Sequence, residues 1–375
     1  ATVESNIKNQ NKTELQAYLK QNPNFRAFGL FRFRLGIYNL SGRDTTKKIN
    51  LFLRKIGEDP VIYDETLTEN SKVEIKRYFE NQGYIPTEVN STVKFKKKKA
   101  NVSYQVTAHR PYRINDYTFR IKNDTILAII EKDSAHMLIK KNMKMDVDVI
   151  HAERVRIHNL LKKNGYYNFN KESLHFLADS TVGDNKVNLQ LVLRRTERVD
   201  SEGNISVNVP KQYTVRNVYI FTSYDPIATL NYENLDSITE NGVKFYYQEK
   251  IHLKPEVFLD NCYIEPNKKY NEEEVEKTYA RLNLLSAIRY VNIRFEEIEG
   301  SNFLDCIILT SPSKTQSYSL DVEGTNSTGD LGFAGILGYQ HKNFFKKSEV
   351  FRASFRLANE MRVFSSEAKK YNSTE

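Results

Sequence analysis

The sequence predicts an α+β fold in which a β-α-α-β-β unit occurs three times and is followed by three long strands. Three observations lead to this prediction. Successive segments place a strong amphipathic helix before two strands that a turn connects. A helix-to-strand joint that ends in Gly-Tyr occurs twice, as NQGY at 81–84 and as KNGY at 163–166. From Ser317 onward, apolar residues alternate with polar or small residues.

In the first unit, the long helix is expected from about Leu67 to Gln82, with Thr66 or Thr68 as its N-cap. Gly83 follows at the position where a left-handed residue ends a helix. An alternating run then leads through a lysine-rich turn, Lys96–Lys99, into a second alternating strand.

The second unit repeats this order. A helix is expected over Val149–Lys163, and Gly165 ends it. Two strands flank Gly183-Asp184-Asn185, a favourable hairpin turn. The third unit has its helix at Glu272–Leu285 and lacks the Gly-Tyr joint, although the order of its elements is kept.

These elements set the expected domain limits. They are 1–109 for the first unit, with an insertion at about 21–66; 110–209 for the second; 210–312 for the third, with an insertion at about 223–270; and 313–375 for the tail.

The tail contains three alternating segments of about the nine to eleven residues that a membrane β-strand needs. We predict that their apolar sides form a lipid-facing surface. The residues assigned to it are Leu331, Phe333, Leu337, Phe351, Phe355 and Leu357. An ordinary soluble sheet with one solvated face has the same alternation, and three strands alone cannot close a barrel.

The positive charge is concentrated near the N-terminus. The chain has a net charge of +9, and residues 1–110 hold 20 Lys and Arg against 11 Asp and Glu. The remaining residues are therefore neutral overall. Two explanations fit this excess of positive charge. The N-terminal part contacts an anionic surface through the turn residues Lys96, Lys97, Lys98 and Lys99, or its charged side chains are simply solvated.

Several chemistries have no signature in the sequence. No phosphate-binding loop, G-x-S-x-G, H-E-x-x-H or C-x-x-C motif is present. His151 and His158 lie on one expected helix near Glu153, where a solvated helix face is favoured over a metal site. Cys306 alternates with apolar residues and reads as a core residue, and its pairing with Cys262 is left open. We therefore expect no enzyme activity and no cofactor.

The repeated unit that ends in Gly-Tyr resembles the POTRA domain. The stretch SYSLDVEGTNSTGDLGFAGILGYQHKNFF at 317–345 is similar to the entry into the β-barrel in the BamA/TamA superfamily. LRKIGEDPVIYDETLTENSKVEIKRYFENQGY at 53–84 is similar to the first POTRA domain of TamL, the lipoprotein form of TamA. Residue 1 is Ala, whereas that form begins with a lipidated cysteine.

The resemblance implies a periplasmic arm of a Gram-negative outer-membrane machine that inserts or exports proteins, followed by the first strands of its barrel. Unfolded outer-membrane proteins or a TamB-like periplasmic protein would be the partners, with no nucleic acid. A fragment of BamA itself is the nearest alternative. A hydrolase or transferase is a more distant alternative, because the sequence has no signature of a convergent carboxylate or histidine pocket. A nucleic-acid-binding module is also more distant, because Phe95 is the only aromatic residue interleaved with the lysine run Lys94–Lys99.

In this interpretation, clients add a strand to an unpaired sheet edge. The expected edges are the middle strands of the units, Tyr84–Phe95, Tyr166–Ala178 and Ile288–Glu297. The contact residues predicted on them are Tyr84, Ile85, Val89, Tyr166, Phe169, Val291 and Ile293. Charged residues on these strands could instead protect solvated edges.

Overall fold

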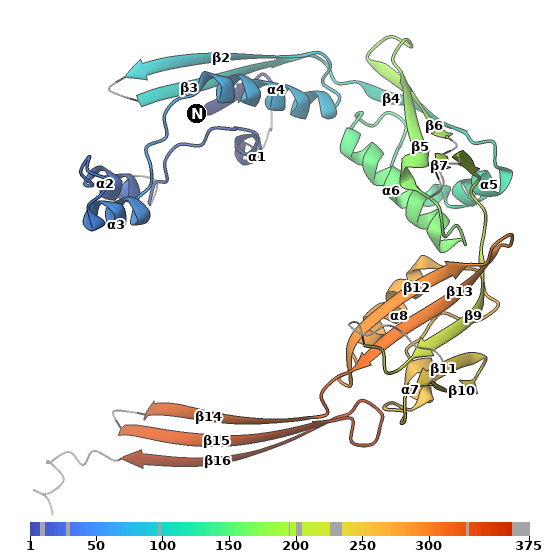
Figure 1. Cartoon of the computed structure of the whole chain (residues 1–375). Coiled ribbons are helices and arrows are strands. Elements are labelled where there is room, and N and C mark those ends of the chain that lie inside the picture. Colours follow the sequence, from blue (N-terminus) through green and yellow to red (C-terminus); the bar gives the residue numbers. More distant parts are fainter. Residues whose placement is uncertain are drawn as a thin grey trace, which may run out of the picture. The chain divides into compact units, whose positions relative to one another are not determined.

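The structure is a computed structural model that describes residues 1–7, 12–27, 31–96, 99–194, 196–199, 205–225, 235–327 and 330–361 (Figure 1). The chain divides into two compact units. The first contains residues 1–157 and 171–194, and the second contains residues 158–170 and 195–375. The expected mixed α+β fold is confirmed, because the structure contains several small sheets together with helices. The four domain limits stay predictions.

The first unit begins with a three-stranded sheet in the order β1-β3-β2. β1 is parallel to β3, and β2 is antiparallel to it. The elements are β1 (Thr2–Ser5), α1 (Lys12–Ala17), α2 (Phe33–Asn39), α3 (Lys48–Ile56), α4 (Glu65–Asn81), β2 (Thr87–Lys96) and β3 (Lys99–Ala108). Ile75 and Phe79 of α4 are fully buried with Tyr104 and Val106 of β3, so one side of α4 covers the sheet.

The N-terminus of α4 differs from the prediction. Asp64 is its N-cap, and the carboxylate of Asp64 accepts hydrogen bonds from the backbone N–H groups of Thr66 and Leu67. Asp is as good an N-cap as Thr, and the helix begins at Glu65, two residues before the expected start. At the other end, Gly83 has φ +85°, as expected for the residue that ends the helix.

A second sheet in the first unit has the order β4-β6-β5. β4 is parallel to β6, and β5 is antiparallel to it. The elements are β4 (Arg113–Arg120), α5 (Asp124–Lys132), η1 (Ser134–His136), α6 (Val147–Lys163), η2 (Lys171–Ser173), β5 (Leu174–Asp179) and β6 (Lys186–Leu193). The hairpin turn between β5 and β6 has positive φ at Gly183, Asp184 and Asn185, which confirms the predicted turn.

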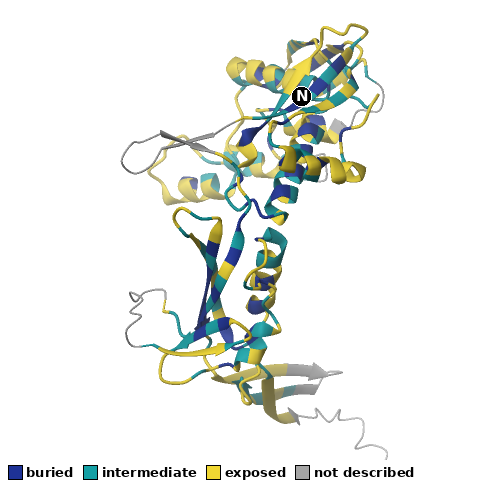
Figure 2. Ribbon diagram, turned by 90° about the vertical axis from the view of Figure 1, so that its right-hand side faces the viewer, coloured by how far each residue is buried: buried dark blue, intermediate teal, exposed yellow. Residues whose placement is uncertain are grey.

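The second unit contains the C-terminal end of α6 and three further sheets. Its elements are β7 (Thr196–Val199), β8 (Ile205–Asn208), β9 (Thr214–Phe221), β10 (Asp236–Glu240), β11 (Val243–Tyr247), α7 (Pro255–Leu259), α8 (Glu272–Asn283), β12 (Ile288–Glu297), β13 (Phe303–Pro312), β14 (Gln316–Ser327), β15 (Asp330–Lys342) and β16 (Val350–Met361). The main sheet has the order β10-β11-β9-β13-β12. The apolar side that faces α7 and α8 is buried (Figure 2).

The expected insertion at about 223–270 extends this sheet. β11 adds parallel to β9, and β10 pairs antiparallel with β11. Phe245 of β11 is fully buried and packs against Phe258 of α7, with ring centroids 5.9 Å apart. The insertion therefore contributes both strands and core residues. It also covers the β9 side of the sheet, so β12 remains as the uncovered edge on the other side.

The last sheet is an open antiparallel meander in the order β14-β15-β16. No closed barrel is present among the described residues. Whether these strands begin one stays a prediction. Separately, none of the helices in the described ranges has the length and apolar character that a membrane span requires.

Candidate functional site

The edge strands that bear on the predicted site are β2, β5 and β12. Each lies at one edge of its sheet and follows a long helix: β2 follows α4, β5 follows α6, and β12 follows α8. These strands are the ones that the sequence predicts as edges, although two of them begin later than expected. β2 begins at Thr87 and β5 at Leu174.

Two of the predicted contact positions are corrected by this later start of β5. Tyr166 and Phe169 precede β5 and are buried, with exposed fractions of 2% and 5%. Gly165 ends α6 with φ +98°, and the chain then turns. The backbone N–H of Tyr166 donates to Leu161, and that of Phe169 donates to Tyr166. These two residues belong to the core and cannot present an open strand edge.

Tyr84 and Ile85 also lie outside their expected strand, because they precede β2. The N–H of Tyr84 donates to the carbonyl of Phe79, and that of Ile85 donates to the carbonyl of Gly83. Val89, by contrast, lies within β2 and is half-buried. The turn after α4 therefore occupies backbone groups that the prediction assigned to the edge.

The edge of β12 has a groove beside it. A hollow of about 440 Å³ is lined by Val275, Glu276 and Tyr279 of α8 and by the β12 segment Tyr290–Ile293. Val291 is buried at the bottom, whereas Ile293 is half-buried and Tyr279 is half-exposed. The structure thus brings the predicted residues Val291 and Ile293 together with α8, a helix that the sequence predicts but that was not assigned to the edge.

This geometry fits an added strand. Side chains alternate between the two faces of a sheet, so every second residue of a strand paired with β12 would lie on the α8 side. Those side chains would contact Tyr279 and Val275, while the backbone paired with β12. Charged residues flank the groove segment of β12: Arg289 precedes it, and Arg294, Glu296 and Glu297 follow it, so Tyr290–Ile293 is the uncharged part of the edge.

The residues of the predicted anionic contact belong to the turn between β2 and β3, and the contact itself stays a prediction. Lys96 and Lys99 lie directly opposite each other and close the hairpin. Lys97 and Lys98 lie outside the described residues. Phe95 beside them is exposed and packs edge to face on Tyr63, with ring centroids 5.5 Å apart.

The tail sheet has one continuous apolar face. Directly opposed residues of neighbouring strands lie on the same face. Leu320, Leu337 and Phe355 form one such row, and the next rows continue the surface. Exposed side chains of this face are Tyr318, Leu320, Val322, Phe333, Leu337, Phe351, Phe355 and Leu357. Leu331 lies in β15 in the same phase as Phe333, and its side chain is outside the described part.

The opposite face of this sheet is polar. It carries Arg352, Ser354 and Arg356 of β16, and Arg356 pairs with Glu323 of β14 at 3.3 Å. Ala334 of β15 lies opposite Glu323 and is fully buried. Most described residues of these strands are exposed or half-buried, so neither face is covered as a core would be. Figure 2 shows these strands as largely exposed.

The turn between β15 and β16 is fixed to the rest of the second unit. Ser286 Oγ donates to the carbonyl of Ser348 at 2.7 Å, and the N–H of Ala287 donates to Ser348 Oγ at 3.1 Å. The amide of Asn343 donates to the carbonyl of His252 at 2.7 Å. This end of the tail sheet therefore meets the α7 and β12 region directly.

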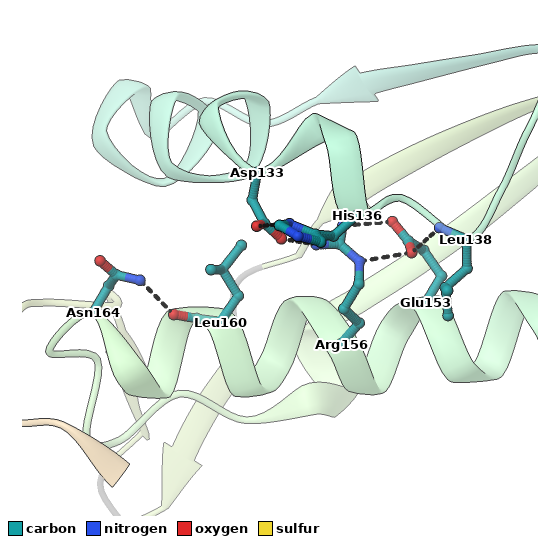
Figure 3. Close-up of polar contacts among 7 residues, drawn as sticks. All are labelled: Asp133, His136, Leu138, Glu153, Arg156, Leu160 and Asn164. Carbon is teal, nitrogen blue, oxygen red and sulfur yellow. Dashed lines mark hydrogen bonds and ion pairs between the residues drawn. The ribbon is translucent and has the colours of Figure 1, made fainter. Parts of the chain in front are cut away.

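The histidines near Glu153 do not form a site with it. Glu153 is fully buried and holds the guanidinium of Arg156 through two hydrogen bonds of 2.7 and 2.9 Å (Figure 3). It also accepts from the N–H of Leu138 at 3.0 Å, and Arg156 pairs further with Asp133. Burial, with a contribution from the charge of Glu153, raises the pKa of Tyr117 well above its usual range. The described residues contain no group of His, Cys, Asp and Glu that could hold a metal ion.

Cys306 is fully buried in the core of the main sheet, which confirms its predicted role there. Cys262 packs at the edge of the same core, and both thiols are free in this structure. Burial raises the pKa of Cys262 to about 11, so its thiolate is rare at neutral pH.

Comparison with known proteins gives structural neighbours only. No family model matches the chain. No curated protein matches it either. It is similar to the crystal structure of POTRA domains 3–5 of Haemophilus influenzae BamA, with 13% identity, a TM-score of 0.38, and coverage of 83% of this chain and 95% of that one.

Two longer proteins are also similar. Haemophilus ducreyi BamA lacking POTRA domains 1–3 is 12% identical with a TM-score of 0.42, over 66% of this chain and 37% of that one. CdiB from Acinetobacter baumannii is 10% identical with a TM-score of 0.32, over 79% and 48%. The chain thus spans less than half the length of these two proteins. The resemblance to TamL stays a prediction.

Proposed function

We propose that this chain is the periplasmic arm of an outer-membrane protein assembly or translocation machine, together with the first strands that enter its membrane domain. The observation that carries the proposal is the apolar face of β14–β16. It extends over three strands of 12 or 13 residues, and most of its described large apolar side chains are exposed. Such a face needs a lipid or protein cover.

In this proposal the arm is a scaffold without catalytic activity or cofactor. It receives an extended strand of an unfolded outer-membrane protein, or of a TamB-like periplasmic partner, on the edge of β12. Backbone pairing is insensitive to most of the client's sequence, whereas the groove beside β12 selects apolar side chains at every second position. This arrangement is the same whether the protein is BamA-like or TamL-like, and the proposed residues of β12 and its groove do not change.

The test uses the full chain and a ten-residue peptide that alternates apolar and polar residues. Hydrogen exchange should slow at amides of β12 when the peptide binds, because the added strand pairs with them. A peptide N-methylated at every second amide cannot make those bonds and should bind at least tenfold more weakly. Equal binding of the two peptides, or protection outside β12 only, would contradict strand addition at this edge.

Two matched substitutions test whether the groove beside β12 binds the peptide. Tyr279→Ala removes an exposed side chain from the α8 wall and should weaken peptide binding about tenfold. Leu284→Ala removes an exposed apolar side chain just after α8, outside the groove, and should leave binding unchanged. An equal effect of both substitutions would mean that the peptide binds α8 by general hydrophobic contact.

A further inference from the structure

The segment between α1 and α4 contains a helical hairpin, α2–α3, whose polar contacts lie inside it. Asn50 of α3 is buried; its amide oxygen accepts from the N–H of Gly42 at 3.1 Å, and its amide N–H donates to the carbonyl of Asp44 at 2.7 Å. Arg54 donates to Ser41 and to the carbonyl of Gly42 at 3.2 and 3.1 Å. The inner side of the hairpin is thus held by hydrogen bonds.

The two helices also approach each other closely. Gly57 follows α3, and a Cβ at this position would lie 2.7 Å from the backbone nitrogen of Tyr38 in α2. The guanidinium of Arg54 lies over the ring of Tyr38, 5.6 Å from its centroid. Side chains on the outer sides are therefore not needed to hold α2 and α3 together.

The base of the hairpin is fixed by Asn24, which is buried. Its amide donates to Glu58 Oε1 at 3.0 Å and to the carbonyl of Asp59 at 2.7 Å, and its oxygen accepts from the N–H of Val61 at 3.1 Å. The chain before α2 and the chain after α3 are therefore joined at this point.

The outer sides of both helices are apolar and exposed. On α3, Ile49, Phe52 and Ile56 follow helical spacing and are 67%, 61% and 42% exposed. On α2 and at its C-cap, Phe33 and Leu40 are 69% and 75% exposed. A helix of a soluble domain turns this side to the core. Here this side is exposed.

The same segment holds most of the net charge of the protein. Residues 25–56 contain eight Lys and Arg against one acidic residue, Asp44, a balance of +7 in a chain whose total is +9. The carboxylate of Asp44 accepts hydrogen bonds from the N–H and the hydroxyl of Thr46. Lys48 and Lys55 lie on α3 beside the apolar side, where long side chains can bury their stems and keep the ammonium in water.

We propose that the α2–α3 hairpin docks on an anionic lipid surface. The apolar sides would enter the boundary between headgroups and acyl chains, and the surrounding Lys and Arg would contact lipid phosphates. A bilayer surface offers an apolar layer directly beneath an anionic one, which matches both features of the hairpin. A nucleic acid would satisfy the charge but leave the aliphatic side chains Ile49, Leu40 and Ile56 exposed.

This inference is independent of the proposed client site and of the tail sheet, because it concerns residues 25–56 alone. It also places lipid contact at a site other than the predicted lysine turn between β2 and β3. Failure of the hairpin to bind lipid would leave the proposed function unaffected. Failure of strand addition at β12 would likewise leave the lipid proposal unaffected.

The chain contains no Trp, so a single introduced Trp reports on one position. In the full chain, Phe52→Trp places the reporter on the outer side of α3. Val73→Trp is the matched control, since Val73 is exposed on α4 in the same compact unit. With vesicles containing phosphatidylglycerol, the emission of the Phe52→Trp chain should shift to the blue and be quenched by brominated acyl chains. The emission of the Val73→Trp chain should not change.

Charge is tested with two variants that lose three positive charges each, built in the Phe52→Trp chain. Lys47→Gln/Lys48→Gln/Lys55→Gln should lower the partition coefficient on anionic vesicles about a hundredfold, at about fivefold per lysine. Lys122→Gln/Lys140→Gln/Lys141→Gln removes exposed lysines elsewhere in the same unit and should lower it far less.

Four outcomes would each overturn the proposal. The first is an emission spectrum of the Phe52→Trp chain that anionic vesicles leave unchanged, and the second is an equal shift on neutral vesicles. The third is an equal effect of the two triple variants. The fourth is a response to an RNA or DNA oligomer in place of vesicles.

Discussion

Leu320 of β14 lies directly opposite Leu337 of β15, and both side chains are more than half exposed. Leu337 in turn lies opposite Phe355 of β16. Three apolar side chains thus form a row across the whole sheet with no cover from the described chain. The cross-strand contacts stabilise the sheet, but the exposed surface favours association with lipid, detergent or another copy.

We predict that the triple variant Leu320→Ser/Leu337→Ser/Phe355→Ser reduces this association. The intact chain should elute as aggregates or bind detergent in size-exclusion chromatography with light scattering, and the variant should shift strongly toward monomer. The control Ser319→Ala/Gln340→Ala/Ser354→Ala changes the polar face of the same sheet and should behave as the intact chain does. A clean monomer of the intact chain without detergent would refute the membrane interpretation of this sheet.

A related expectation concerns the rest of the chain. Removal of residues 313–375 takes away all three tail strands and their apolar face. The remaining chain should be soluble and monomeric under the same conditions. If it associates as strongly as the intact chain, the association arises elsewhere, and the exposed sides of α2 and α3 are the next candidates.

Glu153 and Arg156 should stabilise the first unit only as a pair. Glu153 is fully buried, so removal of the Arg156 guanidinium leaves an unpaired carboxylate in the core. Arg156→Met should therefore cost about 3–5 kcal/mol of the free energy of unfolding. The double variant Glu153→Met/Arg156→Met removes both charges and should recover most of that loss. Urea unfolding of the three proteins measures the difference. A double variant that is less stable than Arg156→Met alone would contradict it.

Local signals in the sequence predicted the parts of the fold that depend on local chemistry. Gly83 and Gly165 end their helices because glycine tolerates the positive φ found at both positions. The edge positions of β2, β5 and β12 follow from the repeated order of elements. The exact beginnings of β2 and β5 could not be predicted, because turns after each glycine occupy the next backbone groups.

Two features needed the three-dimensional structure. β11 joins the main sheet beside β9, a parallel pairing between distant segments that leaves no local pattern. The exposed side of the α2–α3 hairpin could not be predicted for a different reason, because here a local pattern exists but normally indicates burial. Apolar residues at helical spacing normally indicate a buried side, and nothing in Ile49, Phe52 and Ile56 alone shows that this side is exposed. Val73 of α4 is a further apolar helix residue that is exposed, at 58%.

Gly83 and Gly165, which end α4 and α6, should differ in their tolerance of a side chain. Ala at either position requires a left-handed backbone, which costs about 1–2 kcal/mol. At Gly83 the added Cβ would also lie 2.5 Å from the carbonyl oxygen of Met145, whereas at Gly165 the nearest atom is 3.4 Å away. Gly83→Ala should therefore destabilise the protein more than Gly165→Ala. Thermal unfolding compares the two variants, and an equal or reversed order would show that Met145 moves aside without cost.

The last prediction concerns acid and the contact between α6 and α8 in the second unit. Glu273 in the first turn of α8 pairs with Lys163 at the end of α6 and with Lys277 at 2.8 Å. Hydrogen bonds from Lys163 and then Lys277 lower the pKa of Glu273 to about 2. Because the folded pKa lies below the unfolded value, the carboxylate stabilises the fold at pH values above about 4.5, and this contribution is lost as the pH falls toward 2.

Glu273→Gln should therefore lower the melting temperature at pH 7, and the difference from the unmodified chain should shrink steadily between about pH 4.5 and about pH 2. The effect should be small, because this ion pair is exposed to solvent and salt screens it. In a Lys163→Met/Lys277→Met background, where the partners are absent, the same substitution should have little effect at any pH. A difference that persists at the acid end of this range, or that survives in this background, would mean that Glu273 acts through the N-terminus of α8 and not through the two lysines.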